Sequence, residues 1–226
     1  MSLIAVIGDI HGCINTLKEL YPKLKQNTNE IYSVGDLVDR GANSREVIQF
    51  CIDEGIKCVL GNHEDIILRV HGIVPDPPHI TPEKRLENHI INGGDATIKS
   101  YTGSRKIDVK MYRGVLEETG HMEFIKNLPE KIELEGVIIT HAGITSETDD
   151  VIWHRKVPTR LYKFQVYGHT PLKEVDYNPG WYANIDTGCF YKNYGYGNLT
   201  GVILDKETGN VSEFITVENK KDTMIS

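Results

Sequence analysis

The sequence predicts an α/β fold, and three observations support this fold class. Short runs rich in β-branched residues indicate buried strands. Amphipathic helical patterns separate the first of these runs, and a polar motif follows directly after five of them. A chain of 226 residues can bury one substantial core, so we expect a single domain that spans residues 1–226.

Seven segments are expected to form strands, because each is a short apolar run next to turn-forming residues. They are residues 3–7, 31–34, 57–60, 137–140, 164–167, 199–204 and 211–217. Residues 15–25 and 44–53 instead place apolar side chains three or four positions apart, which is the spacing of one face of an α-helix. The chain is therefore expected to begin as a βαβ arrangement.

A proline-rich segment follows these first elements. The prolines between residues 74 and 82 exclude regular structure there. Thr81 followed by Pro82 is typical of a helix start, with threonine as the N-cap and proline at the first helical position. We therefore expect a loop and then a mainly helical insert at about residues 82–127.

Composition and charge exclude several classes of function. The formal net charge of −7 disfavours attraction to phosphates in general, so no stable nucleic-acid or membrane partner is expected. No apolar stretch is long enough to span a bilayer, and residues 3–7 lack the features of a signal peptide. The four scattered cysteines form no Cys-x-x-Cys pair, which predicts reduced thiols and a cytoplasmic protein.

Polar motifs come directly after five of the expected strands. In open α/β sheets, ligands bind outside the carboxyl ends of the strands, so we expect these motifs to converge on one crevice. The motifs are Gly8-Asp-Ile-His-Gly12, Gly35-Asp36, Gly61-Asn-His-Glu64, His141-Ala-Gly143 and Gly168-His-Thr170.

The residue types in these motifs predict two divalent cations. Asp9 and His11 are two positions apart, which places a carboxylate and an imidazole on the same side of an extended segment. Asp36 adds a second carboxylate, whose two oxygens can bridge two cations. The second cation is then expected to bind one amide oxygen and two imidazoles, from Asn62, His141 and His169. This set suits Mn, Fe, Zn or Ni rather than Ca, and Mn is the first expectation in vitro.

Two cations at such a centre predict the hydrolysis of a phosphoester. They lower the pKa of a shared water, so a metal-bound hydroxide is the expected nucleophile. His63 is expected to protonate the leaving group as a general acid, with Asp39 as its partner. Arg40 and Arg155 are expected to bind phosphate oxygens. The histidines without a motif are expected in loops or in solvent: His71, His79, His89 and His121.

The ordered motifs, together with Gly35-Asp-Leu-Val-Asp-Arg-Gly41, resemble the signature of the phosphoprotein phosphatase family of metallophosphoesterases. The resemblance covers nearly the whole chain and is greatest to short bacterial and phage members, in particular the phage lambda phosphatase branch. It implies the calcineurin-like metallophosphoesterase fold, in which two mixed β-sheets pack as a central sandwich flanked by helices. It also implies the dinuclear centre and the residue roles given above.

The sequence leaves the substrate class open. The first hypothesis is a serine/threonine protein phosphatase that acts on phosphorylated proteins or peptides. Asp39 and Glu64 favour it, because the related symmetrical diadenosine tetraphosphatases usually carry Ala and Asp at these positions. The alternative is a bis(5'-nucleosyl)-tetraphosphatase, or another nucleotide pyrophosphohydrolase, acting on a dinucleoside polyphosphate. The insert at 82–127 and the loop at 188–198 are expected to build the pocket that separates the two.

A non-catalytic protein is the third hypothesis. A module that only binds phosphorylated partners would have lost a metal ligand or His63, and none of these residues is missing.

Overall fold

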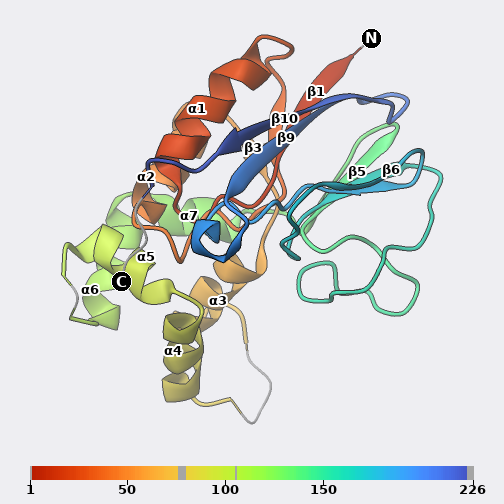
Figure 1. Ribbon diagram of the computed structural model, residues 1–226. Helices are drawn as coiled ribbons and strands as arrows, with labels where there is room; N and C mark the ends of the chain where they lie inside the picture. Colours follow the sequence, from red (N-terminus) through yellow and green to blue (C-terminus); the bar gives the residue numbers. More distant parts are fainter. Residues whose placement is uncertain (1, 76–79, 105, 223–226) are drawn as a thin grey trace.

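Two mixed β-sheets pack against each other at the centre of the computed structural model, which describes residues 2–75, 80–104 and 106–222. Helices cover one side of the first sheet, and the second sheet lies on its other side (Figure 1). The predicted fold class, a central sandwich of two mixed sheets flanked by helices, is confirmed.

The first sheet has five strands in the order β10-β9-β1-β2-β3. β1 (Leu3–Ile7), β2 (Ile31–Ser33) and β3 (Lys57–Cys58) are parallel to one another, in agreement with the expected βαβ beginning. β9 (Asn198–Asp205) runs antiparallel to β1, and β10 (Val211–Glu218) runs antiparallel to β9. The sequence predicted all of these strands, with small differences at their ends.

The second sheet also has five strands, in the order β4-β5-β6-β8-β7. β5 (Val137–Thr140), β6 (Phe164–Tyr167) and β8 (Tyr182–Asn184) are parallel. β4 (Lys131–Glu133) and β7 (Asp176–Asn178) are antiparallel strands at the two edges. β5 and β6 were predicted, whereas the three-residue strands β4, β7 and β8 were not.

Helices connect the parallel strands of the first sheet and fill the middle of the sequence. α1 (Ile14–Lys25) and α2 (Ser44–Asp53) match the predicted helices. α3 (Asn62–Val70) was not predicted. The described part of the expected insert contains four helices: α4 (Pro82–Ile91), α5 (Gly94–Thr102), α6 (Val109–Glu118) and α7 (His121–Lys126). A short 3-10 helix, η1 (Lys192–Tyr194), lies before β9.

The start of α4 has the predicted cap. Thr81 precedes the helix in an extended conformation, and its hydroxyl accepts the backbone N–H of Lys84 at 3.4 Å. Pro82 occupies the first helical position, where a backbone N–H is not needed.

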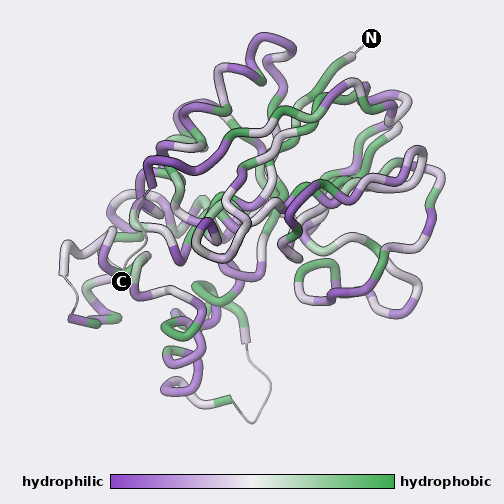
Figure 2. Tube along the Cα trace, viewed as in Figure 1, coloured by the Kyte–Doolittle hydropathy of each residue, from purple (hydrophilic) through white to green (hydrophobic). Residues whose placement is uncertain are grey.

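The strands separate two hydrophobic cores. Successive side chains of a strand point to opposite faces of the sheet, and in β1 Ile4 and Val6 pack between the sheets with residues such as Val137. Ala5 and Ile7 belong to the core under the helices. Figure 2 shows hydrophobic residues along the strands of both sheets. The sheets thereby form a rigid support for the loops that follow the strands.

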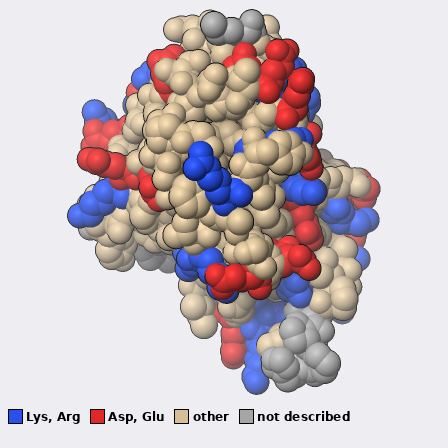
Figure 3. Space-filling model, turned by 90° about the vertical axis from the view of Figure 1, so that its right-hand side faces the viewer, with Lys and Arg blue, Asp and Glu red and all other residues tan. Residues whose placement is uncertain are grey.

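The structure also places the cysteines and shows the charges on one face of the molecule. The four cysteines are buried and free. None of the helices in the described ranges has the length and apolar character needed to cross a lipid bilayer. On the face displayed in Figure 3, acidic and basic side chains are interspersed.

Candidate metal centre

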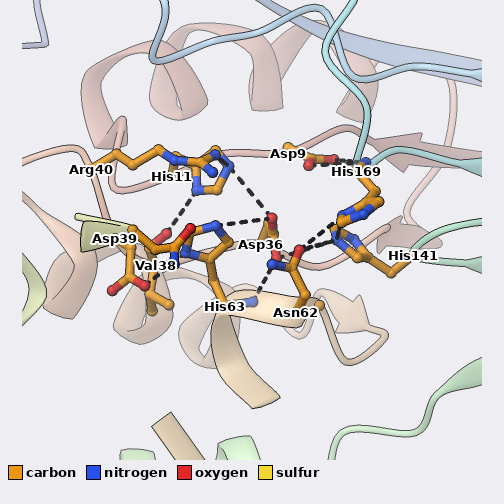
Figure 4. A network of polar contacts seen from close by, with 12 residues as sticks. Asp9, His11, Asp36, Val38, Asp39, Arg40, Asn62, His63, His141 and His169 are labelled. Carbon is orange, nitrogen blue, oxygen red and sulfur yellow. Dashed lines mark hydrogen bonds and ion pairs between the residues drawn. The ribbon is translucent and has the colours of Figure 1, made fainter. Parts of the chain in front are cut away.

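The polar motifs converge in the structure as predicted. The six expected ligands follow parallel strands of the two sheets, and all are buried (Figure 4): Asp9, His11, Asp36, Asn62, His141 and His169. The two sheets approach each other closely here. A Cβ atom on Gly168 would lie 2.0 Å from Asp9 Oδ1, so only glycine lets the loop after β6 approach the loop after β1.

Backbone strain is concentrated at this centre. Every non-glycine residue with positive φ in the described ranges belongs to the expected site: His11 (46°), Asp36 (50°), Asp39 (68°), Arg40 (68°) and His169 (70°). L-residues pay about 1 kcal/mol or more for such a conformation. Such outliers are typical of functional sites.

Asp36 lies between two groups of ligand atoms. Its Oδ2 is 3.5 Å from His11 Nε2, and its Oδ1 is 3.4 Å from His141 Nε2. Two sets of potential ligand atoms each lie within 4.8 Å of one another: His11, Asp36 and His63, and Asp36, His141 and His169. The two oxygens of the Asp36 carboxylate therefore face different sets of ligand atoms, as those of a bridging carboxylate would.

Three hydrogen-bond acceptors meet where Asn62 joins the two histidines of the second set. His141 Nδ1 donates to the carbonyl of Val34 at 2.8 Å, and His169 Nε2 donates to the carbonyl of Trp153 at 3.1 Å. In a neutral ring the other nitrogen then carries a lone pair. These two nitrogens and the Asn62 Oδ1 oxygen lie 2.9 to 3.1 Å from one another. Three lone pairs so close repel one another, and a cation among them removes the repulsion, so this set fits a divalent metal ion.

Burial favours the neutral, metal-binding form of His11, His141 and His169, because it lowers the pKa of each ring. His11 Nδ1 donates to the carbonyl of Val38 at 2.9 Å, which leaves the lone pair of Nε2 facing Asp36. Burial, followed by the charge of Arg40, lowers the pKa of His11 well below its ordinary value. Burial likewise lowers the pKa of His169 to about 3.

The acidic side chains repel one another at the same place. The Asp9 carboxylate accepts the backbone N–H of His169 at 3.1 and 3.3 Å. Burial, together with the negative charges of Asp186 and Asp36, raises the pKa of Asp9 well above its ordinary value. Divalent cations would compensate this buried negative charge.

Asp186 is a residue of the centre that the sequence analysis did not identify. It follows β8, it is 3% exposed, and burial raises its pKa to about 7. The signal that found the other motifs, a polar residue after a parallel strand, applies to Asp186 as well. It was missed because β8 itself was not recognised as a strand.

His63 is oriented toward the centre from the first turn of α3. Its Nδ1 donates to Asp39 Oδ2 at 2.7 Å, and both side chains are almost completely buried. Its Nε2 lies 3.8 Å from Asp36 Oδ2 and has no hydrogen-bond partner in the described ranges. Burial alone would raise the pKa of Asp39, but the charge of His89 and the bond from His63 hold that pKa below its ordinary value. His63 thus offers one free ring nitrogen at the centre and is fixed through the other.

The two expected phosphate-binding arginines also lie at the centre. The Arg40 guanidinium contacts His11 Nε2 and lies over the ring of Tyr191, 5.1 Å from its centroid. Arg155 is exposed and donates to the carbonyl of His169 at 3.1 Å and to the hydroxyl of Thr170 at 3.2 Å. Both guanidinium groups therefore border the centre.

Glu64 has a structural role beside these residues. Its carboxylate accepts the backbone N–H groups of Asp36 at 3.0 Å, Leu37 at 2.8 Å and Gly61 at 3.1 Å. It therefore fastens the strained loop after β2 to the start of α3.

The expectation that the histidines outside the motifs lie in loops or in solvent was wrong for three of them. His71, His89 and His121 are buried. His121, for example, bonds to the Tyr101 hydroxyl at 2.7 Å. His89 bonds to Asp39 in the loop after β2, and His71 lies against the ring of Tyr112 on α6, so these contacts are remote in sequence and no local pattern marks them. His79 lies outside the described residues.

A cavity of about 420 Å³ lies beside the centre. Its lining combines apolar, aromatic and basic side chains: Ile66, Arg69, Ile80, Lys84, Arg85, Asn88 and Trp153. Trp153 lines the cavity and also contacts the centre, because its carbonyl accepts the bond from His169. Its indole N–H donates to Asp65 at 3.0 Å.

The fold and the buried cluster of carboxylates and imidazoles define a class of proteins, the metal-dependent hydrolases of phosphoester bonds. The calcineurin-like phosphoesterase family matches residues 2–196, and the chain belongs to this family. The predicted membership of the metallophosphoesterases is confirmed, and divalent metal ions are the cofactors of this family.

Several known proteins are similar to the chain. A symmetrical bis(5'-nucleosyl)-tetraphosphatase of Shewanella frigidimarina is 29% identical over 65% of the chain, and the match spans only 46% of that protein's length. The asymmetrical bis(5'-nucleosyl)-tetraphosphatase PrpE of Oceanobacillus iheyensis is 27% identical over 84% of the chain and 85% of its own length. A solved serine/threonine phosphatase of Saccharomyces cerevisiae shares the fold, with a TM-score of 0.59 over 96% of the chain and 80% of its own, at 15% identity.

Proposed function

We propose that the chain hydrolyses phosphomonoesters of alcohols, and that phosphoserine or phosphothreonine in proteins or peptides is its substrate. The observation that carries this proposal is the buried His63–Asp39 pair, with its bond of 2.7 Å. An alkoxide is a poor leaving group that needs a proton in the transition state. A nucleotide that leaves a phosphoanhydride departs as a stable anion and needs no such proton. A general acid whose orienting carboxylate is in place therefore favours an alkyl ester as the substrate.

The residues of the centre are assigned to two divalent ions on the basis of their donor atoms. His11 and Asp36, which are 3.5 Å apart, would hold one ion together with Asp9, whose buried carboxylate is repelled by that of Asp36. The other ion would be held by Asp36, Asn62, His141 and His169. Mn is the expected ion in vitro, with Fe, Zn and Ni as alternatives. When bound, such ions polarise the phosphoryl oxygens and lower the pKa of the attacking water.

The protein's own side chains handle the leaving group and the phosphate. Protonated His63 would donate its Nδ1–H to Asp39 and its Nε2–H to the departing oxygen, and the Asp39 carboxylate would stabilise the positive ring. Arg40 and Arg155 would bind the non-bridging phosphate oxygens and align the phosphorus with the attacking water.

The cavity beside the centre favours a second candidate, the hydrolysis of a dinucleoside polyphosphate. Trp153 is 39% exposed and offers a flat surface for a nucleobase. Lys84 in the same lining supplies positive charge for a polyphosphate chain. The names of the Shewanella and Oceanobacillus relatives are in agreement with this candidate.

The experiment that tests the proposal compares kcat/KM for a phosphothreonine peptide and for diadenosine tetraphosphate on one Mn-loaded preparation. A preference of tenfold or more for the peptide, about 1.4 kcal/mol of transition-state stabilisation, would support the first candidate. The reverse preference would support the second. If Mn-loaded protein hydrolysed no phosphoester at all, both candidates would fail and a non-catalytic phosphate-binding module would be the better description.

A further inference from the structure

Asp39 is held from two sides. Its Oδ2 accepts the bond from His63, while its Oδ1 accepts bonds from His89 Nε2 at 3.1 Å and from the Thr97 hydroxyl at 2.6 Å. All four residues are 0% exposed. His89 lies on α4 and Thr97 on α5, so two helices of the insert supply donors to the far oxygen of the carboxylate that orients His63.

The same helices hold the backbone around Asp39. The Asp39 N–H donates to the Thr97 hydroxyl at 2.8 Å, and the Arg40 N–H donates to the carbonyl of Gly93 at 3.0 Å. Both residues have a φ of 68°, a conformation that surrounding contacts must impose. The turn between α4 and α5 thus binds the strained loop that carries Asp39.

The ring of His89 is fixed by its own surroundings. A Cβ atom on Gly94 would lie 1.9 Å from His89 Cδ2, so the ring occupies space that only a glycine leaves free. The ring of Tyr112 is stacked on that of His89, with 6.3 Å between the ring centroids and an interplanar angle of 27°. His89 Nδ1 has no hydrogen-bond partner in the described ranges, so within them the ring makes its hydrogen bond to Asp39 through Nε2.

We propose that His89 is a positioning residue for the general acid, because its N–H fixes the Asp39 carboxylate whose other oxygen orients His63. This proposal rests on the role of His63 in the proposed function. His89 acts through Asp39 rather than on the substrate.

Loss of His89 should affect one part of the reaction. Without the N–H donor, Asp39 Oδ1 keeps the Thr97 bond alone, and the carboxylate can rotate away from the orientation that His63 needs. Proton donation then weakens, whereas the metal ligands and the arginines stay in place. The loss of kcat should be large for esters with poor leaving groups and small for esters with good leaving groups.

The test uses aryl phosphates whose leaving phenols differ in pKa, so that it needs no knowledge of the physiological substrate. His89→Phe keeps a ring but removes the donor. We expect it to lower kcat for phenyl phosphate by about 10- to 100-fold and for 4-nitrophenyl phosphate by less than about threefold, with KM nearly unchanged. His89→Gln, whose amide N–H can replace Nε2–H, should recover most of the loss. Tyr112→Phe is the matched control, since the Tyr112 hydroxyl has no partner in the described ranges, and it should behave like wild type.

A double mutant separates positioning from a merely structural role. If His89 acts through His63, adding His89→Phe to His63→Asn should cause no further loss. Equal losses for all aryl phosphates in both backgrounds would overturn the proposal, and so would a His89→Phe enzyme that behaves like Tyr112→Phe. If His63→Asn itself shows no leaving-group dependence, the general acid of the proposed function is wrong instead. Should His89→Phe fail to fold, His89→Asn, whose amide is too short to reach Asp39, replaces it under the same criteria.

Discussion

Divalent cations should stabilise the folded protein strongly. In their absence the lone pairs of His141, His169 and Asn62 stay 2.9 to 3.1 Å apart, and the carboxylates of Asp9 and Asp36 stay buried together. A ligand that binds only the folded state at a hundredfold excess over its Kd stabilises that state by about 2.7 kcal/mol. For a chain of this length, 1 kcal/mol raises Tm by about 2–4 °C. Saturating Mn²⁺ should therefore raise Tm by at least about 5 °C.

The assay is thermal unfolding, followed by circular dichroism, of protein treated with EDTA and of the same protein with Mn²⁺. The matched variants are Asp36→Asn and His63→Asn. Because the two Asp36 oxygens lie 3.4 and 3.5 Å from ring nitrogens of different sets, Asp36→Asn should abolish most of the shift. His63→Asn should retain it. Two tightly bound equivalents of Mn²⁺ in Asp36→Asn would refute the bridging role, and an equal loss in His63→Asn would make His63 a ligand.

Two further predictions concern stability. Gly94→Ala should destabilise the fold by about 1–3 kcal/mol, because the new methyl group would meet the buried His89 ring. Gly114→Ala on α6 is the matched control: a Cβ atom there has nothing within 4 Å, so the substitution should stabilise the fold by about 0.5–1 kcal/mol. Equal urea midpoints for the two variants would contradict this prediction. Glu30→Gln should cost about 1 kcal/mol at pH 7, a value discounted for the 30% exposure of the side chain. The hydrogen bond from Lys206 lowers the pKa of folded Glu30 from 4.5 to about 2, so this contribution is complete above pH 4.5 and disappears as the pH falls toward 2. Urea titrations of the EDTA-treated wild type and Glu30→Gln should thus show a smaller difference in the free energy of unfolding at pH 3 than at pH 7. A larger difference at pH 3 would refute the assignment.

The predicted elements of the fold are those with a strong local pattern. β1, β5 and β6 are buried apolar runs, and their bounds agree with the prediction. β7 is exposed along its whole length and carries no apolar alternation, so pairing with β8 alone makes it a strand. α3 begins inside the Gly61-Asn-His-Glu64 motif, whose polar residues gave no helical period.

The centre could be predicted as far as its residues follow strands that the sequence reveals. Asp9, Asp36 and His141 do so directly. The contact of His89 with Asp39 joins residues 50 positions apart and depends on how α4 packs. The cap of α1 is equally non-local, because the Asp222 carboxylate accepts the backbone N–H groups of Asn15 and Thr16 from the far end of the chain. A single sequence carries no periodic signal for such pairs.

The left-handed conformations at the centre imply a conflict between thermostability and activity during laboratory evolution. Glycine adopts positive φ without the penalty that the side chains of His11, Asp36, Asp39, Arg40 and His169 pay. A library selected only for folding at high temperature without metal would therefore favour glycine at His169, where it also removes the lone-pair repulsion, but not at Asp39, whose loss would leave three buried donors without an acceptor. Stabilising substitutions are better sought far from these loops, in screens that also measure turnover.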